Sequence, residues 1–414
     1  VLAMDTNNTC IVIGGETFLD CLLGRLLVGG IKPVDGPDGA LLADAIAEHD
    51  SPDPTALVNG LQYRDSEWGD AGYSSLENQA YARRAEIEAA GVPMYVTAGW
   101  FDAATVEGAL ARFMSFSNPQ TVVLAPFSHG GGYDTDPFRP EDAQPVWSRR
   151  EQVERLEAFF AAHLKEDGSP PASELSYYVM NGGWRQTDSW PPAGFADRHY
   201  YLASEGALMP TPSAIQSEPP YTVDFTTGTE PDTRWMTQLG GGDVIYNERN
   251  EATENALRFE TPPLEADMEL TGTVVLNLAL STDQPDGAVH AYLDAVAPDG
   301  HAFYLSEGVL RLKHRKVSTD TPVYPHFGPY RSYLEKDAAP MPEDTPTKVD
   351  LGLYTTSARV PAGFRLRLSL AGADATSFAR IPDTGVPPNW RVHHGGVTAS
   401  RISVPLRPWV EVDE

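Results

Sequence analysis

Two apolar segments, each followed by a polar side chain, constrain the fold of this chain more than any other feature. The stretch 92–99 is typical of a strand covered on both faces, and Asp102 follows just past its carboxyl end. The stretch 106–116 has helical periodicity, and a second apolar strand at 121–125 is followed by His129. Because functional groups of open α/β sheets collect at the carboxyl ends of parallel strands, we expect Asp102 and His129 on adjacent loops at one rim.

An acid and an imidazole on adjacent loops are the supporting pair of a serine hydrolase. The carboxylate fixes the imidazole tautomer and stabilises the imidazolium that forms during attack. In α/β-hydrolases the chain order is Ser, then Asp or Glu, then His, and Asp102 precedes His129 in that order. No Gly-x-Ser-x-Gly elbow precedes them, because the nearest segment, 72–76, lacks the final Gly and an apolar strand before it. The sequence predicts the acid and the base without their nucleophile.

The segments around these two residues resemble a known family. Gly99-Trp100-Phe101-Asp102 and the stretch 125–130, which contains His129, are similar to the acid and base motifs of the cocaine esterase/glutaryl acylase (CocE/NonD) hydrolases. That family is similar to the X-Pro dipeptidyl-peptidase group, and the resemblance covers nearly all of the chain. It implies catalytic roles for Asp102 and His129, with the serine in a Gly-x-Ser-Tyr-x-Gly elbow that would fall before Val1. The serine would then belong to a missing segment of a processed, split or truncated enzyme, or to a separate chain.

The expected fold class is α/β plus β. By resemblance, residues 1–92 form a helical cap and connecting segment, and residues 93–168 form the C-terminal part of an α/β-hydrolase domain. Residues 172–414 show short alternating strands without helices between them, beginning at 175–180, and this pattern indicates a jelly-roll β-sandwich. The resemblance implies a galactose-binding-like domain there. The stretch 151–164 is predicted to be an amphipathic helix that packs on the hydrolase sheet.

Residues beside the acid bear on substrate choice. Trp100 and Phe101 are candidate substrate-binding residues, and packing at the strand end is the alternative. Amino-acid ester hydrolases of the same broad family keep extra carboxylates just after the catalytic Asp to hold an α-ammonium group. Ala103, Ala104 and Thr105 stand at those places here. The resemblance therefore implies a neutral or apolar acyl group.

Charge and composition narrow the partners. The formal net charge of −28 argues against nucleic acid and anionic membranes, and a solubilising surface is its simplest explanation. Cys10 and Cys21 cannot form a disulfide framework, and no apolar stretch is long enough to cross a bilayer. The expected partner is a small ester, amide or peptide substrate, with a second chain carrying the nucleophile, or a homo-oligomer, as further options. No cofactor is expected, and the compartment is open, with the cytoplasm favoured over secretion.

Three functions remain open at this point. The first is a serine esterase or amidase, including an X-Pro dipeptidyl-peptidase-like enzyme, that works through an acyl-enzyme with His129 as base and Asp102 as its support. The second is a catalytically inert binding or scaffolding protein that uses the β-sandwich, because no nucleophile is visible. The third is a metallohydrolase built on His129, Asp102 and Asp134, but these residues have no recurring metal-ligand spacing, so no metal is expected.

Overall fold

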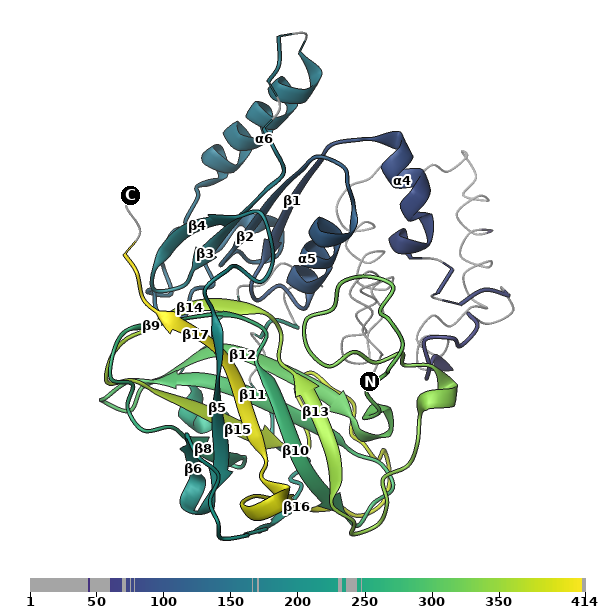
Figure 1. The fold of residues 1–414 in the computed structure, drawn as a ribbon, viewed down its shortest axis with the longest axis vertical. Coiled ribbons are helices and arrows are strands. Elements are labelled where there is room, and N and C mark those ends of the chain that lie inside the picture. The colour runs from purple at the N-terminus through teal and green to yellow at the C-terminus, as the bar shows by residue number, and fades with distance from the viewer. Residues whose placement is uncertain are drawn as a thin grey trace.

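The computed structural model of this chain shows two regions, each built on one sheet (Figure 1). Cys10, Cys21 and most of the predicted helical cap lie outside the described residues. The structure describes residue 44 and the ranges 60–68, 72–74, 76–77, 79–165, 167–169, 171–229, 233–235, 244–246 and 248–411.

The first region is a four-stranded sheet in the order β1-β2-β3-β4. β1 (Met94–Gly99) and β2 (Gln120–Ala125) are parallel, and α5 (Thr105–Ser115) connects them. β3 (Glu174–Val179) also lies parallel to β2, and β4 (Gly183–Thr187) returns antiparallel to β3. The predicted order of strand, helix and parallel strand is therefore confirmed.

The assignment of 175–180 to the first strand of the β-sandwich is wrong. Tyr177 pairs with Leu124 of β2 in parallel register, so this segment extends the first sheet. The alternation of β3, which buries Leu175, Tyr177 and Val179, shows that one face of the strand is covered. The same alternation fits a strand in either sheet, so the pattern could not identify the pairing partner.

β1 is less enclosed than the sequence predicts. In the described part of the chain it pairs only with β2, and β1 forms the edge of the sheet. Met94, Tyr95 and Val96 are half-buried and Thr97 is exposed. The expectation of a strand covered on both faces therefore holds only at its carboxyl end, which leads to the acid.

α6 (Arg149–Leu164) extends from the first sheet as a long helix (Figure 1). It begins with a capping box, in which Ser148 Oγ accepts from the N–H of Glu151 and the Glu151 carboxylate accepts from the N–H of Ser148. The Phe159 ring meets the Tyr95 ring of β1 edge to face, with centroids 5.4 Å apart. None of the residues of α6 is buried, so it packs less closely than predicted. Its exposed apolar side chains are Val153, Leu156, Phe160 and Leu164.

The second region is a 13-stranded sheet whose strands are antiparallel, apart from β6 beside β8. β5 (Ala196–Ala203) pairs with the last strand, β17 (Arg401–Pro408). The other strands are β6 (Ala207–Met209), β7 (Pro220–Thr222), β8 (Leu257–Glu260), β9 (Met268–Gly272), β10 (Val275–Thr282), β11 (Ala288–Val296), β12 (Ala302–Arg311), β13 (Thr347–Gly352), β14 (Thr356–Val360), β15 (Arg365–Ala371) and β16 (Asn389–His393). The short helices described are α4 (Arg84–Ala90), α7 (Arg249–Ala252) and 3-10 turns at Ala80–Arg83, His129–Gly131, Ser204–Gly206, Leu312–His314, Glu335–Asp337 and Gly396–Thr398.

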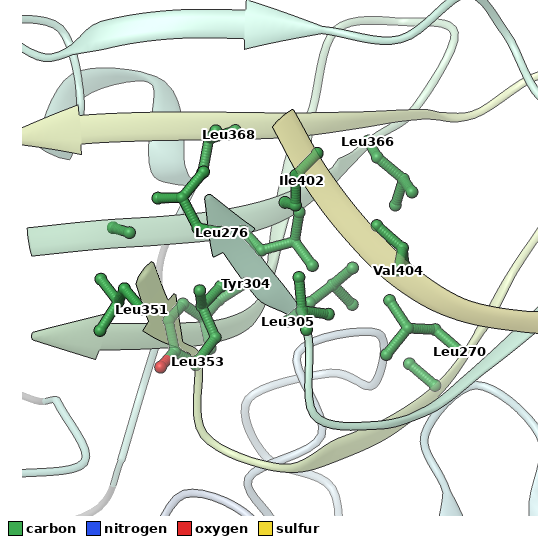
Figure 2. Close-up of a cluster of buried hydrophobic side chains, with 14 of the residues drawn as sticks. Leu270, Leu276, Tyr304, Leu305, Leu351, Leu353, Leu366, Leu368, Ile402 and Val404 are labelled. Carbon is green, nitrogen blue, oxygen red and sulfur yellow. The ribbon is translucent and has the colours of Figure 1, made fainter. Parts of the chain in front are cut away.

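A dense apolar core holds this second region together. β11 is buried along its entire length, and Figure 2 shows leucine, isoleucine, valine and tyrosine side chains from several strands converging inside the sheet. Burying each such side chain contributes roughly 1.5–3 kcal/mol. The side chains labelled there are Leu270, Leu276, Tyr304, Leu305, Leu351, Leu353, Leu366, Leu368, Ile402 and Val404.

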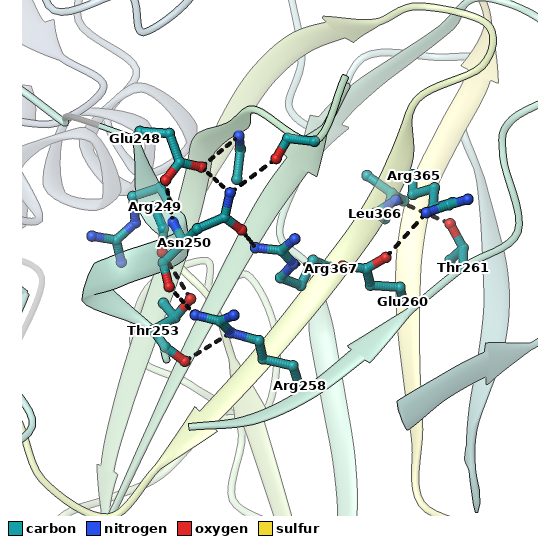
Figure 3. A network of polar contacts seen from close by, with 12 residues as sticks. Glu248, Arg249, Asn250, Thr253, Arg258, Glu260, Thr261, Arg365, Leu366 and Arg367 are labelled. Carbon is teal, nitrogen blue, oxygen red and sulfur yellow. Dashed lines mark hydrogen bonds and ion pairs between the residues drawn. The ribbon is translucent and has the colours of Figure 1, made fainter. Parts of the chain in front are cut away.

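Arginines fix α7 to the sheet (Figure 3). Arg367 of β15 donates to Glu260 Oε1 at 2.7 Å and to Asn250 Oδ1 at 2.5 Å. Arg258 of β8 donates to the Thr253 carbonyl at 2.8 Å. Hydrogen bonds with a charged donor are about twice as strong as neutral ones, so these contacts hold α7 although it is only one turn long.

The two regions touch beyond the end of β3. The Met180 N–H donates to the Ser357 carbonyl at 3.0 Å, and the Met180 carbonyl accepts from the Arg359 N–H at 2.8 Å. Nearby, Glu107 of α5 is buried and accepts from the Thr355 N–H at 2.6 Å. Burial raises the pKa of the Glu107 carboxyl. The helix that follows the predicted acid is thus bonded directly to the second region.

No described helix has both the length and the apolar character needed to cross a bilayer.

Candidate active site

The loop that carries Asp102 leaves β1 in a tight turn. The Trp100 N–H donates to the Ala125 carbonyl, and the Asp102 N–H donates to the Gly99 carbonyl at 3.2 Å. A Cβ atom at Gly99 would lie 2.0 Å from the Phe127 carbonyl oxygen, so this position requires glycine. The two loops that follow β1 and β2 therefore touch main chain to main chain.

The loop that carries His129 follows β2 and folds back on itself. The Ser128 N–H donates to the Tyr133 carbonyl, and the Tyr133 N–H donates to Ser128 Oγ, both at 3.1 Å. Gly130 and Gly131 have φ values of 79° and 71°, a left-handed conformation that glycine adopts without strain. This turn directs the His129 side chain toward the loop that carries Asp102.

The structure brings the two predicted residues together. His129 Nδ1 lies 3.2 Å from Oδ1 and 3.1 Å from Oδ2 of Asp102. The Asp102 side chain is 10% exposed, whereas the His129 side chain is 51% exposed. The carboxylate is thus enclosed behind an imidazole that reaches the surface. This is the relation that an acid must have to the base it orients.

Trp100 and Phe101 are fully buried. Trp100 Nε1 donates to the Tyr178 carbonyl at 2.8 Å. The Phe101 ring meets the rings of Tyr304 and Tyr246 edge to face, with centroids 4.9 Å and 5.4 Å away. Both side chains therefore pack against core residues. This agrees with packing at the strand end, the alternative to substrate binding for these two positions.

Arg234, a residue that the sequence did not single out, bonds to the acid loop. Its Nε donates to the Ala103 carbonyl at 2.8 Å and its Nη2 donates to the Trp100 carbonyl at 2.5 Å. The Ala103 N–H donates back to the Arg234 carbonyl at 2.9 Å. Ala103 has a φ of 45°, which costs roughly 1–2 kcal/mol for a residue with a side chain. A single arginine 131 positions from its partner leaves no local sequence signal.

Asp134 and Asp136 shape the turn beyond the base. The Asp134 carboxylate pairs with Arg139. Asp136 accepts from the N–H groups of Phe138 at 3.0 Å and Asn181 at 3.1 Å, and burial raises its pKa to about 6. Among the described residues, no group of three His, Cys, Asp or Glu side chains could hold a metal ion. The metallohydrolase hypothesis therefore has no ligand set in the described part of the chain.

A basic cavity of about 360 Å³ lies in the second region. None of its lining residues comes from the Asp102 loop or the His129 loop, so it is separate from the candidate site. Its Lys316 pairs with Asp337, and its Lys348 pairs with Asp350 at 2.7 Å. The lining residues are Lys313, Arg315, Lys316, Val317, Asp337, Ala339, Lys348 and Asp350.

Comparison with known proteins finds one family model and several relatives. The model of the X-Pro dipeptidyl-peptidase C-terminal non-catalytic domain matches residues 170–403, more than half of the chain. A protein named "Putative serine esterase" from Mycobacterium bovis is 34% identical over 78% of this chain and 51% of its own length. Cocaine esterase from Rhodococcus is 26% identical over 54% of this chain and 42% of its own length. The chain thus spans about half the length of the curated relatives it matches.

One solved structure gives the fold comparison. A CocE/NonD family hydrolase from Staphylococcus aureus superposes with a TM-score of 0.60 at 15% identity, and the match covers 86% of this chain and 60% of the other. At this identity the likeness concerns the fold, an α/β-hydrolase arrangement followed by a large antiparallel sheet.

Proposed function

Because the chain belongs to the CocE/NonD hydrolase family and carries an X-Pro dipeptidyl-peptidase C-terminal domain, we propose that it supplies the acid and base of a serine esterase. The observation that carries this proposal is the contact of His129 Nδ1 with both oxygens of Asp102. Loops after two adjacent parallel strands provide these residues, at the edge where α/β sheets hold their functional groups.

In the proposed reaction a serine Oγ attacks the acyl carbon while His129 Nε2 takes its proton. Asp102 keeps the proton on Nδ1 and stabilises the imidazolium. The bond to the leaving group then breaks, and Nε2 returns the proton to the departing alkoxide. Water, activated in the same way, releases the acid product and frees the serine.

The serine and most oxyanion donors would come from a segment or second chain outside these 414 residues. Two facts support this part of the proposal: the sequence has no Gly-x-Ser-x-Gly, and the chain spans about half the length of its relatives. The remaining domain expectations belong to the same proposal. These are a helical cap within 1–92, a hydrolase part that begins at 93 and includes β3 and β4, and a galactose-binding-like jelly roll from β5 onward that carries no catalytic residue.

The proposed substrate is a small ester with a neutral or apolar acyl group. Ala103 and Ala104, which follow the acid, are buried and carry no charge that could bind an ammonium group. The proposal includes no nucleic-acid or membrane partner, because a net charge of −28 disfavours binding to anionic surfaces. An amide or X-Pro peptide is the alternative substrate, since the matched domain takes its name from a peptidase.

Active-site labelling and mutagenesis test this proposal together. The protein is expressed from its complete open reading frame, treated with a fluorophosphonate probe, and assayed with p-nitrophenyl acetate and butyrate. We expect the probe to label a serine outside the 414 residues and His129→Ala to abolish turnover. His301→Ala, a change at another exposed histidine, serves as the control and should keep the full rate.

Two outcomes would contradict the proposal. A near-normal rate in His129→Ala would remove the base from its role. Absence of both labelling and hydrolysis in the wild-type protein would favour the inert binding protein instead.

A further inference from the structure

We propose that Arg234 is a positioning residue for Asp102, through which the C-terminal domain described as non-catalytic sets the geometry of the active site. Arg234 lies within the range matched by that domain, 170–403. The inference rests on the proposed function, because it gives a role in that reaction to a residue that touches no reacting atom.

The contacts of Arg234 bracket the acid on both sides. Its Nη2 donates to the Trp100 carbonyl at 2.5 Å, before Asp102, and its Nε donates to the Ala103 carbonyl at 2.8 Å, after it. The Ala103 N–H donates to the Arg234 carbonyl, which closes a third bond. A planar guanidinium has fixed donor directions, so two bonds from one fork set the orientation of the loop as well as its distance.

The loop needs such support because its backbone is strained. Ala103 adopts a φ of 45°, a conformation that residues with a side chain keep only when their surroundings hold it. On the N-terminal side, the Trp100 N–H is bonded to the Ala125 carbonyl at 2.9 Å. The two bonds between Arg234 and Ala103 supply the restraint on the C-terminal side, next to the carboxylate.

Arg234 is itself held rigidly. It is 1% exposed, and its Nη1 donates to the Tyr304 hydroxyl at 3.3 Å. That hydroxyl donates to Glu307 Oε2 at 2.9 Å, and Trp235 Nε1 donates to Glu307 Oε1 at 2.5 Å. The Tyr246 hydroxyl accepts from the Arg234 N–H at 3.0 Å. Groups of the second region therefore hold the guanidinium in the orientation in which it donates to the acid loop.

The charge balance favours a permanent cation at this point. Burial lowers the pKa of the Arg234 guanidinium, but Tyr304, Tyr246 and Glu307 raise it above its usual value overall. The guanidinium donates to two carbonyl oxygens and to the Tyr304 hydroxyl, which in turn donates to the Glu307 carboxylate, so a buried arginine has the polar partners it requires.

Arg249 provides a matched control for a purely structural role. It is 2% exposed in the same region, lies 3.5 Å from Asp294 Oδ1, and sits over the Tyr304 ring at 5.5 Å. None of its described contacts reaches residues 100–103. A change at Arg249 therefore removes a buried arginine from the same core without releasing the acid loop.

The test is a double-mutant cycle in the enzyme expressed from its complete open reading frame. We expect Arg234→Gln to lower kcat by about 10- to 100-fold with a smaller change in KM, since a misplacement of about 1 Å can cost that much. Arg234→Lys should fall between Arg234→Gln and wild type. Arg249→Lys should leave the kcat of the folded enzyme within about twofold. In an Asp102→Asn background, Arg234→Gln should have no further effect, because its partner in catalysis is gone.

Each result decides between a positioning role and a structural one. Equal fold-losses from Arg234→Gln in the wild-type and Asp102→Asn backgrounds, or a full rate in Arg234→Gln, would overturn the inference while leaving the proposed function intact. A wild-type enzyme without esterase activity would instead overturn both. If Arg234→Gln does not fold, Tyr304→Phe replaces it, with an expected loss of about 3- to 10-fold that must likewise vanish in the Asp102→Asn background.

Discussion

β11, in the 13-stranded sheet, is buried along all nine of its residues, whereas only two of the six residues of β1 are buried. α6, beside the same four-stranded sheet, has no buried residue. Within the described residues, the second region thus encloses its own core, and the first region leaves a half-buried edge strand and an exposed apolar helix face. The Asp102–His129 pair lies on the less enclosed region, and Arg234 of the second region is hydrogen-bonded to the main chain on both sides of Asp102.

The region with the larger buried core is therefore not the region that carries the candidate catalytic residues. An exposed edge strand with an apolar neighbour is a surface that other strands and helices cover readily. In the proposed enzyme, we therefore expect the segment that carries the serine to lie against β1 and the apolar face of α6. The second region, with its own filled core, would keep the acid loop in place whether or not that segment is bound.

The largest expected effect is on catalysis. Asp102→Asn should lower kcat by about 10,000-fold, as loss of the carboxylate leaves the wrong imidazole tautomer in a serine triad. The midpoint of thermal unfolding should change little, because the second region dominates the fold. Asp299→Asn, in an exposed turn, is the control. A fall in kcat below tenfold would place the chemistry elsewhere in the molecule.

The second prediction compares the stability of the two regions directly. Leu368→Ala, in the core of the second region, should lower the free energy of unfolding by about 2–5 kcal/mol. Phe160→Ala, on the exposed face of α6, should change it by less than about 0.5 kcal/mol in the 414-residue chain. Urea unfolding followed by circular dichroism measures both.

The same pair of variants also tests whether α6 becomes covered. In protein expressed from the complete open reading frame, the cost of Phe160→Ala should rise above about 1 kcal/mol if the nucleophile-bearing segment packs on this face. An unchanged cost would mean that the segment lies elsewhere.

The third prediction concerns pH. Burial lowers the pKa of His290 from 6.5 to about 4, against an opposing effect of Asp374. The folded state therefore keeps His290 neutral where the unfolded chain is protonated, so stability is full above pH 6.5 and falls as the pH drops toward 4. A shift of this size corresponds to roughly 3 kcal/mol.

The test compares how steeply the free energy of unfolding falls as the pH drops in the wild-type protein and in a variant. Urea unfolding of wild type and His290→Gln at pH 7, 5.5 and 4.5 should show a smaller acid-induced loss in the variant. Asp136, in the first region, and Asp294, in the second, have pKa values raised to about 6 by burial, so they work in the opposite direction and are common to both proteins. If the free energy of unfolding falls equally with pH in both proteins, His290 is not buried in its neutral form.

The smallest predicted effect is at the start of α6. Ser148→Ala removes the capping box with Glu151 and should destabilise the helix by about 1 kcal/mol. Because α6 is not buried, the loss should appear as faster hydrogen exchange of its first-turn amides and hardly at all in global unfolding. Ser169→Ala, an exposed serine outside any helix, is the control. A large fall in global stability would show that α6 is closely packed after all.

The predictable parts of the site were those close together in the chain. β1, α5 and β2 are consecutive, so their patterns alone place Asp102 and His129 on neighbouring loops. The pairing of β3 with β2 was missed, because alternation identifies a strand but not its partner. Arg234 was missed for a related reason: its acceptors at Trp100 and Ala103 lie 134 and 131 positions away, and no local pattern records such a contact.

Gly99 has a consequence for how the acid and base loops can vary. A methyl group there would lie 2.0 Å from the Phe127 carbonyl oxygen and would push apart the two main chains that it now lets meet. Because Phe127 is two residues before His129 and Gly99 three before Asp102, that displacement would pass to both side chains at once. The absence of a Cβ atom at Gly99 thus lets the two main chains come close enough for the carboxylate to reach the imidazole.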